Sequence, residues 1–142
     1  MRPHTLITFD PWASYEENPD HLKAAHAAEE AAWMAGLPSV HPEHLRAGMK
    51  PHSIVDRYYW ARGPHLANRV EDISAFLERK LEAVRAHRGM IRDPQILVDL
   101  RAANARLGEL HQVAYAEVFH YERFGKLEDY LGRHARPARS PR

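Results

Sequence analysis

The start of the chain carries the pattern that most constrains the fold. Residues 5–9 (TLITF) form a β-branched and aromatic run that ends at Asp10, which is typical of a short buried strand. Asn18 and Pro19 then predict a helix start, because Asn is a good N-cap and proline fits the first helical position. We expect an alanine-rich helix over residues 19–35, ended by Gly36-Leu37-Pro38. Its small side chains would allow close packing against a sheet.

The later segments give the order β-α-β-β-α-α, which predicts an α/β layered fold. Residues 39–51 read as irregular with one helical turn at 43–47, and residues 114–120 fit either a last strand or more helix. Ser74 is the expected cap of one helix and Gly89 its end. After the first strand and helix, we expect strands over 54–61 and 66–73, a helix over 74–88, and a further helix that begins at Asp93-Pro94.

Length and charge limit the classes of protein that remain. With 142 residues, the chain predicts one domain over residues 1–131, followed by a basic tail, 132–142, that we expect to be disordered. The tail holds four arginines and no acid, so the rest carries 16 basic against 19 acidic side chains and does not favour nucleic acid. The sequence has no apolar run of about 18 residues, so we expect no membrane span.

Cysteine is absent, which excludes disulfides and thiolate chemistry and fits a reducing cytoplasm. The chain has 11 histidines, so any transition metal would be held by histidine and carboxylate ligands. In open α/β sheets, ligands bind beyond the carboxyl ends of the strands, beside helix N-termini. Asp10, Asn18, Asp20 and His21 fall in that region.

Two interpretations of the Asp20-His21 pair stay open. In the functional one, a carboxylate orients an imidazole and makes it a better base or metal ligand. In the structural one, Asp20 is a first-turn acid that complements the helix dipole, and His21 is a solvated surface residue. Trp12 and Tyr15, in the loop before the helix, either pack locally or stack on a sugar face.

A second histidine element, His41-Pro42-Glu43-His44, lies in the irregular segment. We expect it to be a surface loop. The alternative is a metal role, in which His41 and His44 ligate one ion and His21 is the third ligand. His26, His52 and His87 are expected to have structural roles.

Four segments in order resemble the PIG-L/LmbE-like N-deacetylases. The first resembles the segment of that family that carries a His-Pro-Asp-His signature at the start of a helix, and the others resemble later segments. Together they extend over residues 3 to about 125: FDPWASYEENPDHLKAAHAAEEAAW, GMKPHSIVDRYYWA, RVEDISAFLERKLEAVRAHRGMI and AYAEVFHYERFG. The resemblance implies the C-terminal half of a Rossmann-like α/β fold.

For function, the resemblance implies zinc-dependent hydrolysis of an N-acetyl amide on an amino sugar or glycoside. Zinc would lower the pKa of its bound water and polarise the amide carbonyl. His21 matches a metal ligand of the family and Asp20 the acid beside it. Asn18 stands where many members have a histidine that stabilises the oxyanion, and an amide could still donate a neutral hydrogen bond.

The family's Ala-His-Pro-Asp-Asp-Glu segment, which supplies its other metal ligands and its general base, has no counterpart in this sequence. We therefore expect an incomplete site with one ligand, His21. Three hypotheses follow: a fragment, one half of a split enzyme, or a non-catalytic binding module without zinc. A half-domain should expose an apolar sheet edge or face, so we expect a homo-oligomer or pairing with a complementary N-terminal half.

Overall fold

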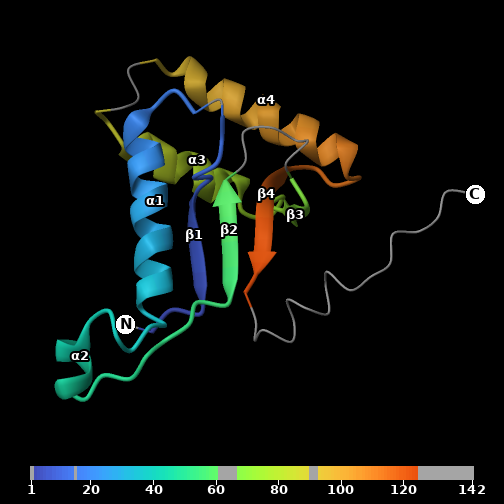
Figure 1. Cartoon of the computed structure of the whole chain (residues 1–142). Helices are drawn as coiled ribbons and strands as arrows, with labels where there is room; N and C mark the ends of the chain where they lie inside the picture. Colours follow the sequence, from blue (N-terminus) through green and yellow to red (C-terminus); the bar gives the residue numbers. More distant parts are fainter. Residues whose placement is uncertain (1, 15, 61–66, 90–92, 125–142) are drawn as a thin grey trace, which may run out of the picture. The chain divides into compact units, whose positions relative to one another are not determined.

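The computed structural model describes residues 2–14, 16–60, 67–89 and 93–124, and these form a mixed α/β structure. The strands follow the order β1-β2-β4-β3 in one sheet, which confirms the expected α/β class. In chain order the elements are β1 (Thr5–Phe9), α1 (Pro19–Met34), α2 (Pro42–Arg46), β2 (Asp56–Trp60), β3 (Arg69–Asp72), α3 (Leu77–Ala86), α4 (Gln95–Leu110) and β4 (Ala116–Arg123) (Figure 1).

The chain divides into two compact units. One contains residues 1–62 and 120–142, and the other contains residues 63–119. Strand β4 crosses the division, because its first four residues belong to the second unit and its last four to the first. The expectation of a single domain over 1–131 stays a prediction, and the basic tail lies outside the described residues. Within the described ranges, no helix is long and apolar enough to cross a membrane.

The first unit is built on parallel strands that α1 connects. Strand β1 pairs with β2 in a register that runs from Thr5 opposite Asp56 to Phe9 opposite Trp60. The carboxyl ends of both strands therefore lie at the same edge of the sheet. Helix α1 packs along β1 (Figure 1), so the loop that leaves β1 and the start of α1 both lie at that edge.

Helix α1 forms where the sequence predicted it. The Asn18 side chain accepts a hydrogen bond from the backbone N–H of Asp20 at 3.0 Å, and Pro19 occupies the first turn. Ala25 and Ala32 are buried at a spacing of about two turns, which places the small face of the helix inward. The helix ends at Met34, one residue before the predicted end.

A buried polar group joins α1 to β2. The Glu29 carboxylate accepts a hydrogen bond from the Tyr59 hydroxyl at 2.9 Å and pairs with the Arg57 guanidinium, which in turn lies 3.9 Å over the Phe124 ring. Burial, followed by the hydrogen bond to Glu29, raises the pKa of Tyr59 above its usual range. This group places Glu29 and Tyr59 on a common face of the first unit.

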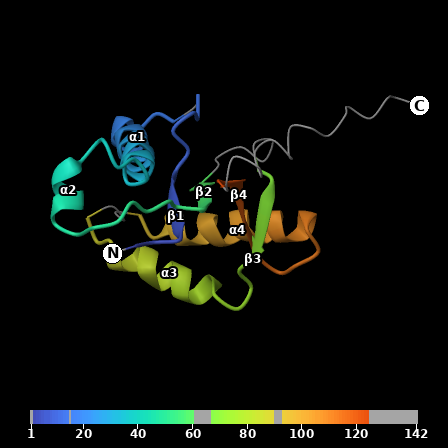
Figure 2. The ribbon, with the colours of Figure 1, turned by 60° about the horizontal axis from the view of Figure 1, so that its bottom comes forward.

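The second unit combines α3 and α4, which pack side by side (Figure 2), with an antiparallel strand pair in which Val70 lies opposite Val118. The buried Asn104 side chain donates to the Ala116 carbonyl at 2.8 Å and accepts from Lys80 at 2.8 Å. Asn104 thereby satisfies the carbonyl oxygen of the first residue of β4. Near the end of α4 the chain turns back and passes close to Gly108. An added Cβ there would stand 2.6 Å from the Val113 carbonyl oxygen.

The start of α3 differs from the prediction. Ser74 is not its cap: both its backbone N–H and its hydroxyl bond the Asp72 carboxylate, and the helix begins at Leu77 after Phe76. These two hydrogen bonds hold Asp72 in its charged form and lower its pKa. The helix ends at Ala86, before the predicted stop at Gly89.

The remaining elements resolve the open points of the sequence. Helix α4 ends at Leu110, and residues 116–120, which fitted either a last strand or more helix, belong to strand β4. The turn expected at 43–47 is the short helix α2. The ends of two predicted strands, at 61 and at 66, and the link at 90–92 lie outside the described residues.

Candidate functional site

The candidate site lies at the edge of the first unit where β1 and β2 end. Asp10 directly follows β1, and its side chain is 3% exposed. One carboxylate oxygen accepts the backbone N–H of Trp12 at 2.9 Å, and the other lies 3.6 Å from Nδ1 of His120. Asp10 therefore fixes the first turn of the loop and holds a histidine from β4 beside it.

His21 lies in the first turn of α1 and is held from two sides. Its ring stacks on Phe9 with a centroid distance of 3.9 Å and an interplanar angle of 6°. Its Nδ1 lies 3.2 Å from a carboxylate oxygen of Glu16, whose side chain is 4% exposed. The contact is at ion-pair distance and is not a hydrogen bond, since the buried Nδ1 of His21 has no hydrogen-bond partner among the described residues.

The structure does not bring Asp20 to His21. The Asp20 side chain is 85% exposed and lies 3.7 Å from Lys23 in an ion pair along the helix. Its position in the first turn suits the positive end of the helix dipole. The acid in contact with His21 is Glu16, on the loop before the helix. Asn18 lies between Glu16 and Asp20 in the sequence. Its side-chain oxygen accepts a hydrogen bond from the Asp20 N–H and so caps the helix.

Two further side chains complete this cluster, and sequence reasoning did not single them out. Tyr59 packs against Trp12 with ring centroids 5.4 Å apart and against His120 at 5.5 Å. His120 also places Nε2 3.4 Å from Glu122, so each of its ring nitrogens faces a carboxylate. The only local signal for His120 was its place at the end of an apolar run. Tyr15 lies outside the described residues.

Within the part of the chain that the structure describes, the donors around His21 do not form a complete zinc site. Among the residues that the structure describes, the only group of three histidine or carboxylate ligands close enough to share an ion is His41, Glu43 and His44. His21 offers one imidazole supported by one carboxylate. An ion at His21 would need further ligands from outside the described residues.

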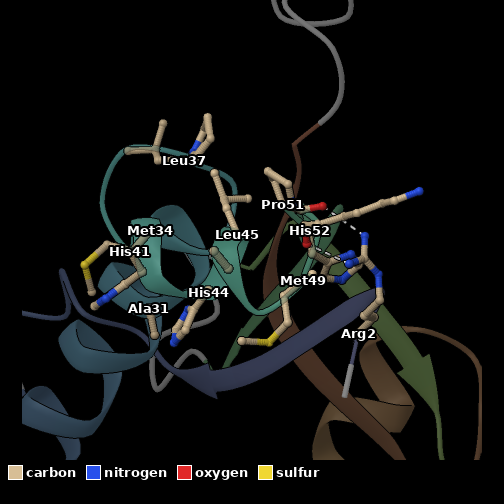
Figure 3. Close-up of a pocket in the computed structure, with 14 residues that line it drawn as sticks. Arg2, Ala31, Met34, Leu37, His41, His44, Leu45, Met49, Pro51 and His52 are labelled. Atoms are coloured by element: carbon tan, nitrogen blue, oxygen red, sulfur yellow. Dashed lines mark hydrogen bonds between the residues drawn. The ribbon is translucent and has the colours of Figure 1, made fainter.

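The His41-Glu43-His44 group lies on the exposed surface, as expected, at the other end of α1 from His21. Its third member is Glu43 rather than His21. His41 and His44 also line a groove of about 890 Å³ formed by the end of α1, α2 and residues 48–52 (Figure 3). In that view Arg2 lies opposite the two histidines and donates hydrogen bonds to the carbonyl oxygens of Lys50 and Pro51.

No protein-family model matches the chain. Among solved structures, N,N'-diacetylchitobiose deacetylase from Pyrococcus horikoshii matches 86% of this chain with a TM-score of 0.74 and 29% identity. A conserved protein from Thermus thermophilus matches 83% with a TM-score of 0.65 and 25% identity. The fold is therefore that of part of an LmbE-like deacetylase.

The comparison of sequences also finds a diacetylchitobiose deacetylase. Over 88 residues, 61% of this chain, it is 44% identical to the diacetylchitobiose deacetylase of Thermococcus kodakarensis. The chain is homologous, over part of its length, to diacetylchitobiose deacetylase of the PIG-L/LmbE family. It spans 32% of that relative and about half of the solved ones, 46% and 51%.

Proposed function

We propose that this chain supplies the C-terminal part of a zinc-dependent N-deacetylase that hydrolyses the N-acetyl amide of an amino sugar. The observation that carries the proposal is the placement of His21. In a chain 44% identical to a diacetylchitobiose deacetylase over 88 residues, this histidine is stacked on Phe9 and paired with Glu16 where two parallel strands end. This is where an α/β sheet binds its ligand.

Each residue has a separate role in this proposal. His21 is one metal ligand, and Glu16 positions it. Asn18 faces the developing oxyanion with its amide N–H, while its oxygen caps the helix. Asp20 contributes negative charge near the site from the first turn, although its side chain lies in solvent beside Lys23. The remaining ligands and the general base come from residues outside this sequence.

A second candidate function is a non-catalytic binding module. It is favoured by the absence, among the described residues, of a three-ligand group at His21. The Asp20 carboxylate that the resemblance would assign to the site also faces solvent. In this case the chain binds a glycan or a partner and needs no zinc.

Zinc content and deacetylation distinguish the two. Both are measured in a His41→Ala/His44→Ala background, which removes the exposed histidine pair, with and without an N-terminal segment of the Thermococcus kodakarensis enzyme. We expect the completed protein to bind zinc and to release acetate from N,N'-diacetylchitobiose. His21→Ala should abolish both. His26→Ala, an exposed histidine on the same helix, is the matched control and should leave both unchanged.

Glu16→Gln separates positioning from ligation. It keeps the shape of the side chain but removes its charge, so zinc affinity should fall by roughly 10–100-fold without loss of the site. If the completed protein neither binds zinc nor releases acetate, the binding module is the better description. Zinc retained in His21→Ala would contradict the ligand assignment.

A further inference from the structure

We propose that His41, Glu43 and His44 form a second metal site, distinct from His21, which takes a divalent transition metal such as Zn²⁺. One ligand atom from each residue lies within 4.8 Å of the other two. Zinc–nitrogen and zinc–oxygen bonds are about 2.0–2.2 Å long, so one ion bridges ligand atoms up to about 4.4 Å apart. Small rotations of these exposed side chains bring the group within that range. All three residues are exposed, which leaves the site open to an ion from solution.

The local backbone brings these side chains together. His41 precedes α2, Pro42 is at its first turn, and the N–H of His44 donates to the His41 carbonyl at 3.0 Å. This turn stacks the two imidazole rings, with centroids 4.9 Å apart and planes 27° apart. Glu43 reaches back so that one carboxylate oxygen lies 2.8 Å from Nδ1 of His41.

The donor types suit a borderline metal. Two imidazoles and one carboxylate are the ligand set of many zinc sites that keep a fourth position open.

The proposed metal site borders the groove at the end of α1. His41 and His44 form part of its wall, and the apolar side chains of Met34, Leu45 and Met49 form another part (Figure 3). Its volume of about 890 Å³ is that of a small-molecule site.

This site is separate from the one at His21. His21 is in the first turn of α1, and the groove lies at its last turn. The helix has 16 residues, which corresponds to a length of about 24 Å. No single ion could contact both sites, so the second site stands whether or not His21 binds zinc.

The test is a titration of metal-free protein with Zn²⁺ by calorimetry, with Co²⁺ absorption as a probe of ligand type. We expect His41→Ala/His44→Ala to bind one equivalent less than the unchanged protein. His44→Ala alone should weaken that equivalent by more than about tenfold, since even the loss of a supporting residue costs roughly 10–100-fold. Glu43→Gln should weaken it as well.

His87→Ala is the matched control, because His87 is an exposed histidine at the end of α3. It should leave the titration unchanged, and His21→Ala should leave this equivalent in place. In NMR spectra the His41 and His44 ring signals should shift on Zn²⁺ addition while that of His87 does not. An unchanged stoichiometry in the double variant, with circular dichroism confirming its fold, would overturn the proposal. So would the loss of all binding in His21→Ala.

Discussion

The rings of Phe9 and His21 stack face to face, with centroids 3.9 Å apart and planes 6° apart. Phe9 is the last residue of β1, and His21 is in the first turn of α1. The stack therefore ties the end of the strand to the start of the helix and holds the candidate ligand in one orientation.

Replacing Phe9 by leucine keeps an apolar side chain but removes the ring. Because aromatic pairs contribute about 0.5–1.5 kcal/mol beyond burial, we expect Phe9→Leu to lower the free energy of unfolding by about 1 kcal/mol. Urea denaturation measures it. Ile7→Leu is the control on the same strand, since Ile7 is 67% exposed and should change stability by less than about 0.5 kcal/mol. Equal effects at the two positions would contradict a role for the stack.

The ion pair between Glu29 and Arg57 gives a larger expected effect. Removing the carboxylate leaves the buried guanidinium without its charge partner, and breaking a buried pair costs about 3–5 kcal/mol. We expect Glu29→Ala to lower the free energy of unfolding by about 3 kcal/mol, at the lower end because Glu29 is partly exposed. Glu30→Ala, the exposed neighbour on α1, should change it by less than about 0.5 kcal/mol.

Tyr59 makes stability depend on pH in the alkaline range. Its pKa is raised in the folded protein by burial and by Glu29, above an ordinary value of 10.0. Above that pH the unfolded chain loses the proton first, which favours unfolding. The stability that the Tyr59 hydroxyl adds is therefore fully present below pH 10 and is lost as the pH rises further.

We expect Tyr59→Phe to cost about 1 kcal/mol at pH 7, the worth of a hydrogen bond, and less as the pH rises above 10. Urea unfolding at several pH values measures the difference from the unchanged protein. Tyr121→Phe is a useful comparison, because Tyr121 bonds Asp56 and its pKa is also raised. If the cost of Tyr59→Phe were constant with pH, the raised pKa would be wrong.

The sequence predicts those parts of the fold that depend on interactions between residues close together in the chain. Asn18, Pro19 and the alanine spacing act within a few residues, so the sequence predicted α1 to within one residue of its end. The predicted start of α3 was wrong because the Asp72 carboxylate, two residues earlier, accepts the hydrogen bonds of Ser74. That competition between a turn and a cap leaves no distinct pattern.

The site shows the same limit. The His21 position was predicted, but its partner Glu16 belongs to a loop without periodicity. The contact between Asp10 and His120 joins residues more than a hundred positions apart. Only strand pairing brings such residues together, and one sequence carries no signal for a particular pair. Residues 114–120 were ambiguous for the same reason, since pairing with β3 decides that they lead into a strand.

Gly108 tests the close approach of α4 to the chain that follows it. An added Cβ would stand 2.6 Å from the Val113 carbonyl oxygen, which is backbone and cannot rotate away. We expect Gly108→Ala to lower the free energy of unfolding by about 1–3 kcal/mol through overpacking. Gly89→Ala is the matched control, with nothing within 4 Å of the added carbon, and should be neutral or slightly stabilising. Thermal unfolding of both variants checks the difference.

Asn18 connects stability with the proposed function. Its side chain accepts the Asp20 N–H at 3.0 Å, and the loss of such a cap costs about 1 kcal/mol. We therefore expect Asn18→Ala to lower the free energy of unfolding by that amount and Asn18→Asp to preserve it. Asn18→His introduces the residue that the resemblance to the N-deacetylases implies at this position, but histidine is a weaker cap, so it should also lose stability.

In the protein joined to an N-terminal segment of the Thermococcus kodakarensis enzyme, the imidazole of Asn18→His can carry a positive charge and would stabilise an oxyanion better than an amide does. We expect this variant to release acetate from N,N'-diacetylchitobiose faster while it unfolds more easily. Measuring both quantities on the same preparation separates the two effects. A slower reaction with unchanged stability would mean that the Asn18 amide has a role of its own at the site, because neither capping nor charge would then account for the loss.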